Sequence, residues 1–144
     1  MAGFYGRASD VITEIPKSRF DIDPVFSEDT EKVGTSYTRW GGFVGDVDGL
    51  DAPFFGMSPR EAKTIDPQER LLLETSWELF ERGGYLPDQL AGSKTGVYVG
   101  ISANEYLTES GMSHDAINAY SLLGTAHSAV VGRISYWLGL EGPN

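Results

Sequence analysis

The sequence predicts an incomplete α/β domain, and three observations lead to this class. Two helix-start signals follow each other closely at Ser58 and Asp66, and the second opens a long amphipathic helix over residues 67–82. The β-branched and aromatic run TGVYVG, residues 95–100, is bounded by glycines and predicts one strand buried on both faces. A second apolar helix lies near the end of the chain. One predicted strand is too few for a complete α/β sheet.

Each helix start carries the same local device. Ser58 stands at an N-cap position with Pro59 as the first helical residue and Glu61 where a capping box has its acid. The sequence DPQE repeats this arrangement from Asp66 to Glu69. We therefore expect a short helix ending near residue 65 and a second helix immediately after it.

The helix over residues 67–82 has one apolar face and one charged face. Its apolar stripe follows the helical period and consists of Leu73, Ser76, Trp77 and Phe80, widened by Leu72 and Leu79. Two oppositely charged pairs, Arg70–Glu74 and Glu78–Arg82, are spaced for the solvent side. Gly83 and Gly84 supply the stop.

The remaining segments give weaker signals. We expect a helical turn at residues 11–14, halted before Pro16, an exposed loop over residues 27–36, and irregular backbone over residues 37–56. Near the end of the chain, Val130, Ile134, Trp137 and Leu138 share a stripe of a helix whose small residues, such as Gly132, would let a neighbouring backbone approach closely. Gly139 ends this helix and Gly142-Pro143 forms a turn.

Composition excludes several classes of function. The 144 residues are 40% hydrophobic, which suits one folded domain, and the formal charge is −10 with no Lys/Arg cluster, which disfavours nucleic acid. There is no cysteine, so neither disulfides nor thiolate chemistry is available. No signal peptide and no apolar run of membrane length is present. We expect a soluble, cytoplasmic protein that binds neither nucleic acid nor membrane.

Familiar chemical motifs fail on spacing. In DVDGLD the glycine is fourth and position twelve is Met57, unlike a calcium-binding EF-hand loop, so Asp46, Asp48 and Asp51 are interpreted as turn formers. GVYVGISANE lacks a dinucleotide fingerprint. His114 and His127 show no metal-ligand spacing, and His127 cannot face its neighbour Ser128 across a helix. The residues alone therefore define no catalytic group and no metal site.

Long stretches of the chain nevertheless resemble one family. YTRWGGFVGDVDGLDAPFFGMSPREAKTIDPQERLLLETSWELFERGG closely resembles the N-terminal half of a β-ketoacyl synthase domain, of the kind found in modular polyketide synthases. DVITEIPKSRFDID, GSKTGVYVGISANEY and GTAHSAVVGRISYWLGLEGPN fall in family order around it. The resemblance covers nearly the whole chain from Asp10 onward.

The resemblance implies a thiolase-like αβαβα layered fold, of which residues 1–144 would be the N-terminal portion with an incomplete sheet. The family acts as a homodimer. It condenses an acyl group held on a cysteine with a malonyl-type extender on an acyl carrier protein. That cysteine lies just beyond the GLxGP phrase, and two histidines come later, so none of the three positions occurs here. The family's opening strand, resembling IVGMxCRFPG, is also missing. Gly142-Pro143 would be the turn into the nucleophile's strand.

These implications leave three alternatives open. The chain is part of the condensing enzyme and inactive alone, or it is a non-catalytic module that binds a complementary chain or carrier protein. The third alternative, a folded structural unit with no partner, is disfavoured because apolar surface would be exposed. Whether it is itself an enzyme is undecided by its sequence. By position in the family pattern, Thr125, His127, Ser128 and Val131 would line the acyl pocket or a dimer contact. No cofactor is expected in the chain itself, because the substrates are carried on the phosphopantetheine of an acyl carrier protein.

Overall fold

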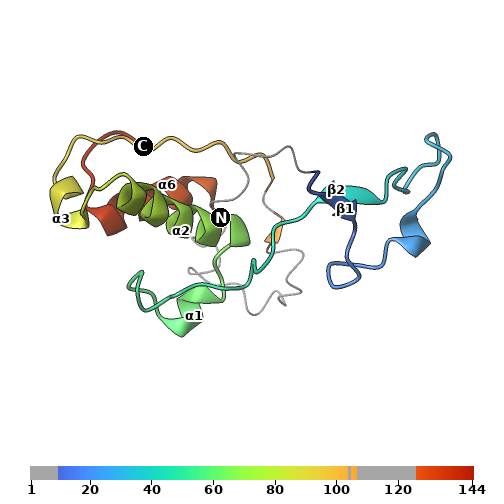
Figure 1. Ribbon diagram of the computed structural model, residues 1–144, viewed down its shortest axis with the longest axis horizontal. Helices are drawn as coiled ribbons and strands as arrows, with labels where there is room; N and C mark the ends of the chain where they lie inside the picture. The colour runs from blue at the N-terminus through green and yellow to red at the C-terminus, as the bar shows by residue number, and fades with distance from the viewer. Residues whose placement is uncertain (1–9, 104, 107–125) are drawn as a thin grey trace. The chain divides into compact units, whose positions relative to one another are not determined.

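The computed structural model describes residues 10–103, 105–106 and 126–144, and it divides the chain into two compact units (Figure 1). The N-terminal unit is Met1–Gly45 and the C-terminal unit is Asp46–Asn144. Within the described residues, no helix combines the length and the apolar character needed to cross a membrane.

The N-terminal unit is built on a short hairpin. Strand β1 (Ile12–Glu14) pairs antiparallel with β2 (Trp40–Gly42), and a 3-10 helix, η1 (Asp23–Val25), lies between them in sequence. The prediction of a helical turn at residues 11–14 is therefore wrong. The segment of residues 37–56, expected to be irregular, contains the strand β2. The β-branched side chains of Val11, Ile12 and Thr13 favour extended backbone, and pairing with β2 decides the outcome.

One arginine ties this unit together. Arg39 donates from Nε to Glu14 Oε1 at 3.0 Å and from Nη2 to Asp23 Oδ1, joining β1 and η1 to the segment before β2. Its guanidinium lies 4.8 Å from the ring centroid of Phe26. The loop expected over residues 27–36 is confirmed as turns and irregular backbone, closed by Ser27 N donating to Ser36 O at 2.9 Å.

The C-terminal unit is helical. Among its described residues, the helices are α1 (Pro59–Ala62), α2 (Pro67–Arg82), α3 (Pro87–Leu90) and α6 (His127–Leu138). The bounds expected for α2 are confirmed at both ends, because Asp66 Oδ1 accepts from Gln68 N at 2.8 Å and Gly83 follows as the C-cap. Ser58 Oγ caps α1 by accepting from Glu61 N at 3.2 Å. The short helix α3 was not expected.

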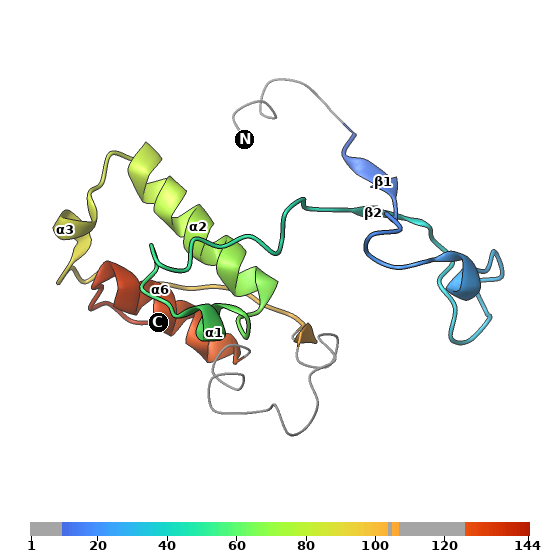
Figure 2. The ribbon, with the colours of Figure 1, turned by 90° about the horizontal axis from the view of Figure 1, so that it is seen from below.

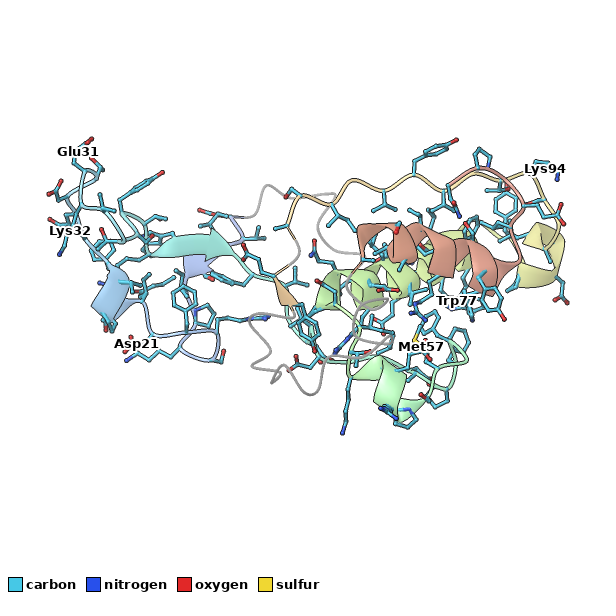
Figure 3. The ribbon with its side chains drawn as sticks, turned by 180° about the vertical axis from the view of Figure 1, so that it is seen from behind. Asp21, Glu31, Lys32, Met57, Trp77 and Lys94 are labelled. Carbon is cyan, nitrogen blue, oxygen red and sulfur yellow. The ribbon has the colours of Figure 1, made fainter. Side chains whose placement is uncertain are left out.

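The core of this unit lies between α2 and α6, which run side by side in Figures 1 and 2. Leu73 of α2 is fully buried, and Val130, Ile134 and Leu138 of α6 are at most 4% exposed, which confirms the stripe expected for that helix. Four aromatic rings pack beside them, with Trp77 5.0 Å from Phe54 and 5.6 Å from Trp137 between centroids (Figure 3 labels Trp77). Phe55 is the fourth ring.

The predicted strand at residues 95–100 is not formed. The segment is extended but belongs to no sheet, and Tyr98 is 77% exposed instead of buried. The β-branched sequence favours extended backbone, yet a strand also needs partners on its edges, and the described residues supply only a few hydrogen bonds there. The prediction of a close backbone approach at Gly132 is also wrong among the described residues, because none of them outside its own helix turn lies within 4 Å of where its Cβ would stand.

Candidate functional site

The C-terminal turn, defined as Leu140–Asn144, runs beside the extended segment of residues 93–97. Glu141 N donates to Ser93 O at 2.8 Å, and Val97 N donates to Pro143 O at 3.0 Å. In a parallel ladder, these two bonds place Ser93 opposite Leu140 and Val97 opposite Asn144, which is one consistent register. The turn is therefore set beside the extended segment like the beginning of a parallel strand.

Two residues of the turn explain why the pairing is close but incomplete. A Cβ on Gly142 would stand 2.3 Å from the carbonyl carbon and oxygen of Thr95, so only glycine fits there. The next residue, Pro143, has no N–H and cannot donate to Thr95 O. The sequence Gly142-Pro143 thus permits close approach while leaving one ladder position unbonded.

An apolar groove lies beneath this pairing. It has a volume of about 240 Å³ and is lined by Ser76, Leu79, Phe80, Thr95, Gly96, Val97, Tyr98, Val99, Ile134 and Leu140. Leu79, which the sequence places on the buried stripe of α2, is 66% exposed at its edge. The groove offers apolar side chains next to extended backbone that, among the described residues, is bonded only in part, to the C-terminal turn.

A charged cluster fixes α6 to the starts of α1 and α2. Arg133, in the middle of α6, donates from Nη1 to Glu61 Oε1 at 2.6 Å and from Nε to Glu69 Oε1 at 2.5 Å. We call these three residues the ion triad. Glu61 and Glu69 were expected to complete capping boxes, but their carboxylates bind Arg133 instead. The one feature of the sequence that could have indicated these ion pairs is Arg133 itself, a single charged residue within the apolar run GRISYWL.

Glu69 is the most deeply buried member of the ion triad. Its side chain is fully buried, and its Oε2 has no hydrogen-bond partner in the described part of the chain. Burial raises the pKa of Glu69, and the nearby carboxylates of Asp66 and Glu61 raise it further, against the opposing charge of Arg133. For Arg133, burial acts to lower the pKa, but bonding to Glu61 and Glu69 outweighs it and the pKa is raised. The folded chain therefore holds two carboxylates against one buried cation.

We expect the replacement Glu69→Gln to remove a destabilisation of the folded chain that grows with pH. A carboxyl group whose pKa is raised in the folded state binds its proton more tightly when the chain is folded. The contribution of Glu69 to the free energy of unfolding therefore falls as the pH rises from 4.5, the ordinary pKa of a glutamate, through the raised pKa. The free energy of unfolding of Glu69→Gln minus that of the unchanged chain should therefore increase from pH 4.5 to pH 7. Urea unfolding at several pH values measures it. A difference independent of pH would contradict the raised pKa.

A second arginine also departs from expectation. Arg70 was placed on the solvent side with Glu74, yet it is only 7% exposed and forms no ion pair with a described residue. The pair Glu78–Arg82 is confirmed, with Oε2 and Nη2 2.8 Å apart. Tertiary contacts with the loop before α1 and with Tyr106 draw Arg70 inward.

The aspartates of DVDGLD behave as turn residues. Asp51 Oδ1 accepts from Phe54 N at 3.2 Å, and Asp46 has a positive φ of 38°. Both features are typical of aspartate in tight turns. Among the residues that the structure describes, no group of three or more His, Asp or Glu could hold a metal ion.

Of the four residues expected to line an acyl pocket or dimer contact, the structure describes three, and all three belong to α6. Thr125 lies outside the described residues, as does His114. His127 is the first residue of α6, Ser128 is exposed and Val131 is half-buried. Neither Ser128 nor Val131 lines the apolar groove. Their role stays a prediction.

The element order, the close-packed α2 and α6, and the parallel turn define a portion of a thiolase-like α/β domain. The chain belongs to the β-ketoacyl synthase family: the model of the β-ketoacyl synthase N-terminal domain matches residues 7–144. An oxazolomycin ketosynthase domain from Streptomyces albus superposes with a TM-score of 0.79 at 33% identity, over 94% of this chain and 24% of that one. This confirms the family and the fold expected from the sequence.

Curated relatives are large synthases. The chain is 48% identical over 134 residues to a phenolphthiocerol/phthiocerol polyketide synthase of Mycobacterium tuberculosis, covering 93% of this chain and 7% of that protein. It is 47% identical over 135 residues to polyketide synthase GfsB of Streptomyces halstedii, covering 93% of this chain and 2% of that protein. The chain thus spans a small fraction of the relatives it matches.

Proposed function

We propose that the chain is the N-terminal portion of a ketosynthase domain of a modular polyketide synthase. The complete domain would catalyse decarboxylative Claisen condensation between an acyl thioester and a malonyl-type extender on an acyl carrier protein. The family match and the identity to polyketide synthases support this assignment. The observation that carries it is the parallel register of the C-terminal turn beside residues 93–97, at the place where the resemblance puts the turn into the nucleophile's strand.

The chain would contribute scaffold and not reacting groups. It has no cysteine to hold an acyl group. Its proposed roles are to support the nucleophile's strand beside residues 93–97 and to supply part of the acyl pocket wall or dimer contact from Thr125, His127, Ser128 and Val131. Homodimerisation and the carrier protein with its phosphopantetheine arm belong to this proposal. The charge of −10 disfavours direct contact with an acidic carrier, because like charges repel.

Mass spectrometry after incubation with an acyl thioester tests the inactive-scaffold role. We expect no covalent acyl adduct on the 144-residue chain, and any adduct would contradict it. A second chain carrying the remaining ketosynthase residues, with its cysteine and histidines, should bind this chain and restore condensation. Binding without condensation would instead support the non-catalytic interaction module, for which the apolar groove provides a surface. Absence of binding would count against both.

A further inference from the structure

Arg70 is a buried cation surrounded by neutral oxygen atoms. Its Nε donates to Ile65 O at 3.0 Å, its Nη1 to Asp48 O at 2.9 Å and its Nη2 to the hydroxyl of Tyr106 at 3.2 Å. Tyr106 in turn donates to Lys63 O at 3.1 Å. None of these oxygens carries a charge. Burying an arginine without a carboxylate is costly, because its charge loses hydration without gaining a counter-ion.

The guanidinium still has hydrogen-bonding capacity. Arginine has five N–H groups, and those three bonds leave two of them without an acceptor among the described residues. The side chain is only 7% exposed, so bulk water does not surround these donors. A planar, buried guanidinium with free donors is suited to an oxyanion such as phosphate or carboxylate.

The free space lies next to this arginine. A pocket of about 300 Å³ is lined by Asp48, Leu50, Ala62, Lys63, Arg70 and Tyr106. Lys63 is a second basic residue of the lining, and the Tyr106 ring centroid lies 5.8 Å from the Arg70 guanidinium carbon. The carboxylate of Asp48 is the only acidic group among these six residues, and it opposes an anion.

We propose that this pocket, the Arg70 pocket, binds a small oxyanion of the phosphate or carboxylate class. The anion accepts from the unoccupied N–H groups of Arg70 and supplies the counter-charge that the described residues lack. Lys63 strengthens the attraction and Asp48 weakens it. This site is separate from the C-terminal turn and from the start of α6, and it requires no group of the condensation reaction.

Thermal unfolding of the full chain tests the proposal with inorganic phosphate and acetate as separate probes, each compared with chloride at equal ionic strength. Ligand bound to the folded state alone raises the unfolding temperature in a saturable manner. We expect such a rise with phosphate if the site prefers a phosphate group and with acetate if it prefers a carboxylate. A chain that responds to neither beyond chloride would overturn the proposal.

Three surface variants make the test specific to this pocket, because Arg70→Gln should abolish binding but can also prevent folding. From the strength of exposed ion pairs, Lys63→Gln should weaken the anion about two- to fivefold, and Asp48→Asn should tighten it by about the same factor. Lys94→Gln is the matched control, because it makes the same charge change at an exposed lysine outside the pocket. Equal affinities in Lys63→Gln, Asp48→Asn and Lys94→Gln would overturn the proposal.

Discussion

Arg133→Met should lower the free energy of unfolding of this chain by about 3–5 kcal/mol, the usual result of removing one partner from a buried ion pair. The substitution leaves the fully buried carboxylate of Glu69 with no cation, beside Glu61 with a quarter of its side chain exposed. Since folded domains are stable by about 5–15 kcal/mol, this loss approaches the whole stability of a small domain. Urea unfolding followed by circular dichroism measures it.

Two further variants separate the effect of breaking the ion triad from the effect of removing a positive charge. Arg82→Met removes an exposed arginine paired with Glu78 on α2, and it should cost no more than about 0.5 kcal/mol. Adding Glu69→Gln to Arg133→Met should recover part of the loss, because the unpaired buried charge is then gone. If Arg133→Met behaves like Arg82→Met, the ion triad does not hold α6 to α1 and α2 in solution.

The ion triad also shows where reasoning from sequence ends. The bounds of α2 follow from residues adjacent to them, namely the cap at Asp66, the proline at the first helical position and Gly83. The side-chain destinations of Glu61 and Glu69 depend on Arg133, more than sixty residues away in sequence. Local signals therefore predict where α1 and α2 begin, whereas the tertiary partner decides what the side chains of Glu61 and Glu69 bind.

The strands show the same limit in another form. At β1 the sequence predicts a helical turn before Pro16, but pairing with β2 makes the segment extended. At residues 95–100 the β-propensity is high, yet the segment joins no sheet among the described residues. A strand is defined by its neighbours, so its existence cannot be inferred from its own residues alone. The function could be inferred from the family resemblance because that resemblance extends over nearly the whole chain and does not depend on any single element.

The interface between α2 and α6 gives the second large effect, which we expect from Leu73→Ala. Leu73 is fully buried against the apolar stripe of α6, and removing such a side chain from a core costs about 2–5 kcal/mol. The matched control is Leu79→Ala on the same helix, where the side chain is 66% exposed and the change should stay within about 0.5 kcal/mol. Urea unfolding of both variants measures the difference.

The same pair of variants tests the proposed incompleteness of the domain. Leu79 borders the apolar groove beside the extended segment, a surface that would be available to a second chain carrying the remaining ketosynthase residues. Leu79→Ala should therefore have little effect on the chain alone but should weaken its binding to a second chain carrying those residues, measured by titration calorimetry. Binding unchanged by Leu79→Ala would place the partner elsewhere. Comparable losses from Leu73→Ala and Leu79→Ala in the isolated chain would show that both faces of α2 are already buried.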